Sequence, residues 1–159
     1  LAEGGQLVVI GSGEAEIEAA YRAAAAEYPE NVSVHLGYDD AFSHRIMAGA
    51  DVLLVPSRFE PCGLTQLYAL RYGTLPLVRR VGGLADTVID ATPESLQAGT
   101  ANGFVFVDAN SRALAARIAD ACALYRDGTA WRLVQKRGML QDYSWADSAV
   151  RYEALYRSI

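Results

Sequence analysis

Short apolar runs alternate with longer amphipathic stretches along this chain. The apolar runs lie at Gln6–Ile10, Val32–Gly37, Asp51–Val55, Thr74–Val81 and Gly103–Val107. The first run, QLVVI, is nearly all apolar, which is typical of a strand buried on both faces of a sheet. The pattern therefore predicts five strands.

The stretches between the runs carry helix signals. Ile17, Ala20, Tyr21 and Ala24 recur at helical spacing before a stop at Pro29. Further helices are predicted over Asp40–Ala48, over Leu64–Tyr72 with Gly73 at the end, and within the segment GGLADTVID after a turn.

The C-terminal part is predicted to be helical from Ser111 onward. Ser111 is expected to cap a helix that reaches about Arg126, and Thr129 to cap the next one. Ser144 is expected to cap a last helix through Tyr156. The stretch Thr92–Asn102 reads as a long, polar and mobile loop.

Strands separated by helices predict βαβ units and a mostly parallel sheet. We therefore expect an α/β fold, a Rossmann-like open parallel sheet flanked by helices. The length of 159 residues suits a single domain, 1–159.

Composition narrows the function classes. The net charge of −5 argues against a general nucleic-acid or membrane-surface binder, which needs a basic face. No apolar run approaches the ~20 residues of a membrane span. The start Leu-Ala-Glu-Gly-Gly lacks an initiator Met and a signal segment, so we expect a cut from a longer chain.

The two cysteines, Cys62 and Cys122, lack the spacing of metal ligands. A disulfide between them stays open, but reduced thiols in the cytoplasm are the better interpretation. The histidines His35 and His44 have no second ligand at metal spacing, so no metal site is predicted.

Ligands of open α/β sheets bind beyond the carboxyl ends of the strands. This rule selects four loops, at Gly11–Glu14, Gly37–Asp40, Pro56–Leu64 and Val81–Leu84. The first begins like the dinucleotide fingerprint G-x-G-x-x-G, but Glu16 stands at the third glycine position. Acidic residues at a helix start repel a pyrophosphate, so NAD binding is disfavoured.

The loop within PSRFEPCGLTQLYALRYG holds the clearest binding signal. Pro61 sets the backbone before a helix, so the amides of Cys62, Gly63, Leu64 and Thr65 are expected to face outward. The positive end of a helix dipole and a glycine that admits close approach are typical of a phosphate site.

Three other features of these loops have two interpretations each. Glu60 beside this helix start either accepts hydrogen bonds from sugar hydroxyls or pairs with Arg58 on the surface. Tyr38 either stacks on a nucleobase or is a partly buried rim tyrosine, and the second is favoured. The pair Gly82-Gly83 either approaches the same ligand or turns the chain, and again the second is favoured.

The PSRFEPCGLTQLYALRYG segment, followed by GGLADTV and later by YSWADSAVRYEALY, resembles the bacterial glycogen synthase and plant starch synthase family. The resemblance covers nearly the whole chain. It implies a two-domain GT-B glycosyltransferase that transfers glucose from ADP-glucose to the non-reducing end of an α-1,4-glucan, with retention and without a metal or other cofactor.

The resemblance also assigns roles to residues of this chain. Glu60 is expected to contact the donor glucose as the catalytic residue, and Tyr38 to lie against adenine. The segment from Cys62 to Thr65, namely Cys62, Gly63, Leu64 and Thr65, is expected to hold the sugar and the distal phosphate. Arg58 is expected near the pocket.

By the same resemblance, the chain is the donor-nucleotide half of a cytoplasmic enzyme whose N-terminal domain is missing. We expect it to bind ADP weakly and to transfer nothing alone. In the strand order 3-2-1-4-5-6, the missing first strand belongs between Gln6–Ile10 and Asp51–Val55. We expect these edges to pair directly or a second chain to fill the gap. Residues 144–159 are expected to form a helix that packs toward the missing domain and otherwise exposes apolar surface.

Two rival functions remain. One is a non-catalytic module that binds ADP or a nucleotide sugar without turnover. The other is a dinucleotide oxidoreductase domain, which Glu16 disfavours.

Overall fold

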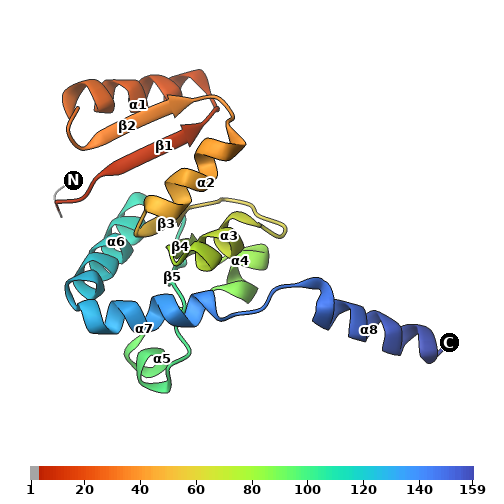
Figure 1. The fold of residues 1–159 in the computed structure, drawn as a ribbon. Helices are drawn as coiled ribbons and strands as arrows, with labels where there is room; N and C mark the ends of the chain where they lie inside the picture. The colour runs from red at the N-terminus through yellow and green to blue at the C-terminus, as the bar shows by residue number, and fades with distance from the viewer. Residues whose placement is uncertain (1–3) are drawn as a thin grey trace.

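The computed structural model describes residues 4–159. Strands and helices alternate along the chain up to β4, two helices separate β4 from β5, and only helices follow β5 (Figure 1). The elements are β1 (Leu7–Gly11), α1 (Ala15–Glu27), β2 (Val32–Leu36), α2 (Asp40–Gly49), β3 (Val52–Val55), α3 (Thr65–Tyr72), β4 (Leu75–Arg79), α4 (Gly82–Thr87), α5 (Pro93–Ala98), β5 (Phe104–Phe106), α6 (Ser111–Arg126), α7 (Gly128–Met139) and α8 (Trp145–Arg157). The five predicted strands and the α/β class are confirmed.

The strands form two separate parallel sheets. β1 pairs with β2, and β3, β4 and β5 form the second sheet in that order. β1 and β3 each have one edge that pairs with no described strand. The prediction that these edges pair directly is therefore wrong. Figure 1 shows β1, rather than β2, on the side toward β3, which agrees with the doubly wound order in which a further strand would stand between them.

The core of the molecule surrounds the second sheet. Leu75, Leu77 and Phe104 are almost completely buried, and Trp131 of α7 packs onto them. Val8 of β1 is instead 47% exposed, and α1 buries none of its residues fully. The prediction that the first strand is buried on both faces is wrong: α1 lies on one face of the small sheet, and one edge of β1 pairs with no described strand.

The predicted loop Thr92–Asn102 contains helix α5. The Thr92 side chain accepts from the Ser95 amide, and the Ser95 side chain accepts from the Thr92 amide in return. Asn102 is fully buried, and its Oδ1 accepts from the Ile89 amide at 2.6 Å. The expectation of a mobile loop is wrong, because this capping box and the buried Asn102 fix both ends of the segment.

Two predicted helix caps lie one or two residues too late. Asn110, not Ser111, caps α6, and its side chain accepts from the Ala113 amide at 2.8 Å. Asp127, not Thr129, caps α7. Asn and Asp cap as well as Ser or Thr, and the polar residue nearest the helix start took the role in both cases. The caps at Ser144 and Gly73 are confirmed.

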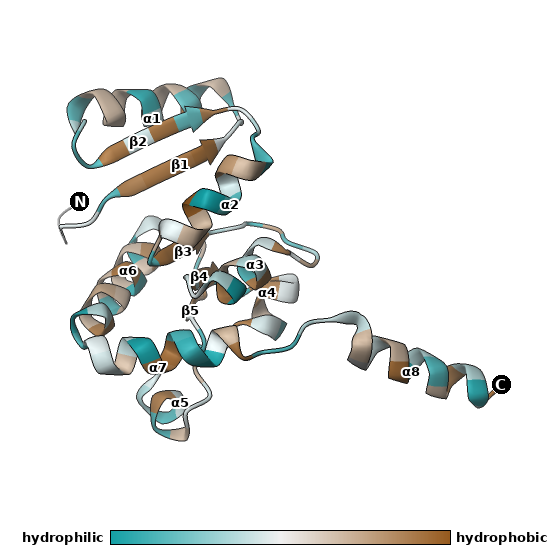
Figure 2. Cartoon of the chain, in the orientation of Figure 1, coloured by the Kyte–Doolittle hydropathy of each residue, from teal (hydrophilic) through white to brown (hydrophobic). Residues whose placement is uncertain are grey.

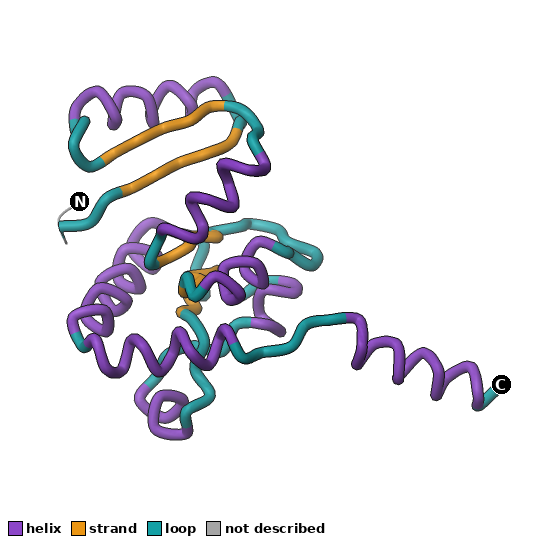
Figure 3. Tube along the Cα trace, viewed as in Figure 1, coloured by secondary structure: helices purple, strands orange, loops and turns teal. Residues whose placement is uncertain are grey.

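Helix α8 extends away from the rest of the molecule after a short coil (Figures 1 and 3). Its apolar side chains are solvent-exposed, including Trp145 at 78% and Tyr156 at 70%, and Figure 2 shows several hydrophobic segments along it. The expectation that this helix exposes apolar surface is confirmed. Within residues 4–159, no helix is long and apolar enough to cross a membrane. Cys62 and Cys122 are both free thiols.

Candidate functional site

The loop between β3 and α3 brings the predicted binding residues to the carboxyl end of the second sheet. Helix α3 begins at Thr65 without a side-chain cap, after Leu64. Within the described part of the chain, no hydrogen-bond acceptor meets the amides of Cys62, Gly63, Leu64 and Thr65. Cys62, Leu64 and Thr65 are exposed, so neighbouring side chains do not fill this helix start. The geometry fits an anion held by main-chain amides.

Glu60 and Arg58 form no ion pair with each other in the described structure, so the interpretation as a surface pair is wrong. Glu60 is half-buried, and its Oε2 accepts only a long hydrogen bond of 3.5 Å from the Ser57 hydroxyl. Most of the hydrogen-bonding capacity of this carboxylate therefore remains available to a ligand.

Arg79, which the sequence analysis did not single out, fixes the backbone of this loop. Its Nη1 donates to the carbonyl of Ser57 at 3.1 Å and to that of Arg58 at 2.8 Å, while Nε donates to the Val107 carbonyl at 3.2 Å. The signal was a charged residue at the end of the buried strand LPLVR.

The glycine pair at the start of α4 lies against the same loop. A Cβ on Gly82 would stand 1.6 Å from the carbonyl oxygen of Glu60, and one on Gly83 would stand 2.3 Å from that of Cys62. Gly82 also has a φ of +48°, which other residues rarely adopt. The interpretation as a simple turn is incomplete, because the pair admits close contact between the loops after β3 and β4.

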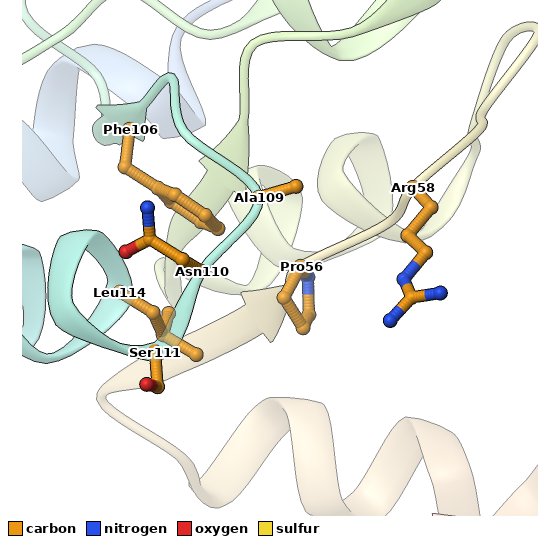
Figure 4. Close-up of a pocket in the computed structure, with 7 residues that line it drawn as sticks. All are labelled: Pro56, Arg58, Phe106, Ala109, Asn110, Ser111 and Leu114. Carbon is orange, nitrogen blue, oxygen red and sulfur yellow. The ribbon is translucent and has the colours of Figure 1, made fainter.

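A cavity of about 180 Å³ lies beside this loop, at the carboxyl ends of β3 and β5 and the first turn of α6 (Figure 4). Pro56, Phe106 and Asn110 line it, and Arg58 extends from the loop on the side of Pro56 away from Phe106. Ligand sites usually measure about 300–1,000 Å³, so this cavity alone does not enclose a nucleotide sugar. Arg58 is the single predicted site residue in its lining.

Tyr38 follows β2 on the smaller sheet. It is 88% exposed, so the interpretation as a partly buried tyrosine is wrong. Its hydroxyl donates to Asp40 Oδ1 at 3.2 Å, and this hydrogen bond to the carboxylate, with its negative charge, raises the pKa of Tyr38. One exposed aromatic ring is thus held by its hydroxyl, with its faces open to a stacking partner.

Helix α2, which follows the Tyr38 loop, packs against α3. The His44 ring lies 5.6 Å from Tyr68 and 5.8 Å from Tyr72 between ring centroids, and the Tyr72 hydroxyl is 3.2 Å from His44 Nδ1. Tyr38 therefore lies in a loop of the small sheet and Glu60 in a loop of the larger sheet. Contacts between α2 and α3 link these two parts of the molecule.

The first loop is occupied by its own helix. The Gly13 amide donates to Glu18 Oε1 at 3.0 Å, so a carboxylate of α1 already takes this donor. This contact agrees with the prediction that the loop does not bind a pyrophosphate. The described residues hold no group of three or more His, Cys, Asp or Glu placed to bind a metal, and the metal-free site stays a prediction.

The chain is similar to proteins that transfer sugars. Residues 3–132 match the family described as glycosyl transferases group 1. Over its full 159 residues, the chain is 57% identical to a glycogen synthase from Erwinia tasmaniensis. The matched region makes up 33% of that protein.

Two solved structures have the same fold. The catalytic domain of starch synthase IV from Arabidopsis thaliana, bound to ADP and acarbose, matches with a TM-score of 0.86 and 36% identity, over 99% of this chain and 33% of that one. A sucrose-phosphate synthase from Thermosynechococcus elongatus matches with a TM-score of 0.68 and 26% identity, over 97% of this chain and 38% of that one. The chain thus spans about a third of the length of its relatives.

Proposed function

Because the chain belongs to the glycosyl transferases group 1 family, we propose that it is the donor-binding part of a glycogen or starch synthase. The enzyme would transfer glucose from ADP-glucose to the non-reducing end of an α-1,4-glucan with retention. The parallel sheets flanked by helices match the GT-B fold of starch synthase. The similarity to a glycogen synthase over the whole chain supports a glucan acceptor, and the similarity to a starch synthase bound to ADP supports an ADP-linked donor.

The observation that carries the proposal is the start of α3. Its unpartnered amides from Cys62 to Thr65 lie next to the open carboxylate of Glu60. In the reaction, the bond between glucose C1 and the distal phosphate oxygen breaks, C1 bonds to the oxygen of a glucan hydroxyl, and the hydroxyl proton passes to the departing ADP phosphate or to solvent. Preorganised amides stabilise the charge that leaves with ADP, and such donors usually supply the largest part of catalysis.

The other predicted residues complete the donor site. Glu60 would contact the donor glucose, where sugar hydroxyls can donate to its carboxylate. Tyr38 would lie against adenine through its exposed ring, and Arg58 would stand near the diphosphate. We propose that the reaction needs no metal and no other cofactor. The two free thiols support a cytoplasmic location, because cytosolic thiols stay reduced.

The remaining two-thirds of the enzyme would supply the acceptor side and further phosphate ligands. We therefore propose that the isolated chain binds ADP weakly and transfers no glucose. A non-catalytic module that binds ADP or a nucleotide sugar is the alternative, since the same site geometry serves binding without turnover.

Replacing Glu60 with Gln tests the catalytic role. In the protein formed by joining the chain to the N-terminal two-thirds of a related synthase, Glu60→Gln should lower kcat by about 10²–10³-fold, because a polar group at the reacting centre is altered. The measurement is glucose transfer from ADP-glucose to glycogen. Glu94→Gln, an exposed change on α5, is the matched control and should leave kcat unchanged.

The outcomes separate the two functions. Full activity of Glu60→Gln would exclude Glu60 as the catalytic residue. Binding of ADP-glucose by the joined wild-type protein without transfer would favour the non-catalytic module. Calorimetry with ADP and NAD tests the nucleotide, and tighter binding of NAD would overturn the proposal.

A further inference from the structure

Gln66 is a fully buried polar residue in the first turn of α3. Its Nε2 donates to the carbonyl of Gly63 at 2.9 Å and to that of Cys62 at 3.3 Å. It also lies 3.3 Å from the hydroxyl oxygen of Thr87 on α4. One side-chain amide thus joins the loop Pro56–Leu64 between β3 and α3, called the motif loop from here on, to its own helix and to the neighbouring helix α4.

These hydrogen bonds set the direction of two peptide units. In a trans peptide, the carbonyl of one residue and the amide N–H of the next point in opposite directions. The described chain contains no cis peptide bonds. Because Gln66 holds the carbonyls of Cys62 and Gly63 toward the interior, the amides of Gly63 and Leu64 must point the other way. Those are two of the four amides in the proposed phosphate site.

The surroundings of Gln66 leave little freedom. Gly63 has a φ of +72°, and a Cβ there would stand 2.7 Å from Gln66 Oε1 and 3.2 Å from Leu84 Cδ2, so a larger residue would displace the Gln66 side chain. Thr87 donates its own hydroxyl proton to the Gly83 carbonyl at 2.7 Å and can accept from Gln66. The Cys62 carbonyl is therefore confined between Gln66 and the backbone of Gly83.

The same amide carries an energetic cost. Gln66 Oε1 is buried and has no hydrogen-bond partner among the described residues. An apolar side chain of the same length would fill this space without leaving a buried oxygen unpaired. The amide is useful at this position for its two N–H donors, which an apolar side chain lacks.

We infer that Gln66 is a positioning residue for the diphosphate of the donor. It holds two carbonyls inward, so that the Gly63 and Leu64 amides are directed at the ligand before the ligand binds. This inference rests on the proposed function, because it specifies how that same site is preorganised. Under this inference, Gln66 sets the affinity for the diphosphate and does more than stabilise the fold.

Binding of ADP and AMP to the 159-residue chain tests the inference. In Gln66→Met, the amides of Gly63 and Leu64 are no longer held toward the ligand, so they lose hydrogen bonds to the charged distal phosphate of ADP. The affinity for ADP should therefore fall at least about tenfold. The affinity for AMP, which lacks the distal phosphate, should change less than ADP affinity. NMR titration at a temperature where the variant is folded measures both affinities.

Gln135→Met is the matched control. Gln135 Nε2 donates to the Gly73 carbonyl at 2.7 Å, at the other end of the same helix. This variant also loses a hydrogen bond from a glutamine to a backbone carbonyl, but it leaves the amides at the start of α3 in place. Its preference for ADP over AMP should equal that of the wild type.

A second test does not depend on how Gln66→Met folds. In the wild type, titration with inorganic diphosphate should shift the Gly63 and Leu64 amide signals, and Thr87→Val should weaken this response. An unchanged ADP preference in Gln66→Met, or a diphosphate response confined to other amides, would overturn the inference alone. Absence of any ADP preference in the wild type would overturn the proposed function as well.

Discussion

The backbone contact between Gly82 and the motif loop depends on a missing side chain. The Glu60 carbonyl occupies the position where a Cβ of residue 82 would stand. Because α4 starts at this glycine, the contact fixes the distance between the loops after β3 and β4. The candidate site therefore depends on a residue that has no polar group to offer a ligand.

Replacing Gly82 with Ala should disturb both stability and site. We expect a loss of about 1–3 kcal/mol in the free energy of unfolding, because alanine is strained at positive φ. The clash with the Glu60 carbonyl should add to this loss and displace the loop. Urea unfolding followed by circular dichroism measures the stability.

Gly49→Ala serves as the control for Gly82→Ala. Gly49 is the last residue of α2, and a Cβ there meets nothing within 4 Å. Alanine should change stability by at most about 1 kcal/mol at this position, in the stabilising direction. Equal effects of the two substitutions would contradict the close contact at Gly82.

The residues of the site differ in how far the sequence predicts them. Glu60 and the helix-start amides follow from local order along the chain, since a proline, a glycine and a helix start are neighbours there. Arg79 acts through hydrogen bonds to residues 21 and 22 positions away. Gln66 bonds the nearby carbonyls of Cys62 and Gly63, but its contact with Thr87 joins residues 21 positions apart. Such contacts depend on which strands are adjacent, so the local pattern does not reveal them.

At the level of elements, the boundaries of helices are set by short side chains just before them. Asn110 before α6 and Asp127 before α7 each accept hydrogen bonds from amides in the first turn. In both cases a hydroxyl residue follows and looks equally suited in the sequence. Only a residue with a non-helical backbone just before the helix can direct its side chain to the amides of the first turn.

Removing the cap of α6 tests this assignment. Asn110→Ala should lower the free energy of unfolding by about 0.5–2 kcal/mol, because the Ala113 amide loses its acceptor. Ser111→Ala should have almost no effect, since Ser111 is already inside the helix. Thermal or urea denaturation of both variants measures the difference, and a larger loss for Ser111→Ala would restore the original prediction.

At the level of the whole molecule, the two sheets do not join, and the doubly wound order would place one further strand between β1 and β3. β1 ends the small sheet and β3 ends the larger one, each with an unpaired edge in the described chain. Unpaired edges of parallel strands invite another strand. The prediction that a second chain fills this position stays a prediction, and under the proposed function the same position would suit a strand from a further part of a longer synthase.

Hydrogen exchange tests how this position is filled. In the 159-residue chain, amides on the free edges of β1 and β3 should exchange rapidly. Joining the chain to the N-terminal two-thirds of a related synthase should slow them by at least about tenfold, because paired strand amides exchange only on opening. Slowing that depends on the concentration of the chain alone would instead indicate self-association, and equally rapid exchange in both proteins would show that no strand enters.

The sequence by itself determined the order and type of the elements, their parallel arrangement and the place of the candidate site. These follow from apolar runs, helical spacing and neighbouring residues, all of which are local. Only the tertiary structure decided that the sheet divides in two, that α4 lies against the motif loop, that Arg79 holds that loop and that Gln66 is buried against Thr87 of α4. These features depend on contacts between distant segments and on which strand edges pair. A local sequence pattern predicts neither the contacts nor the pairing.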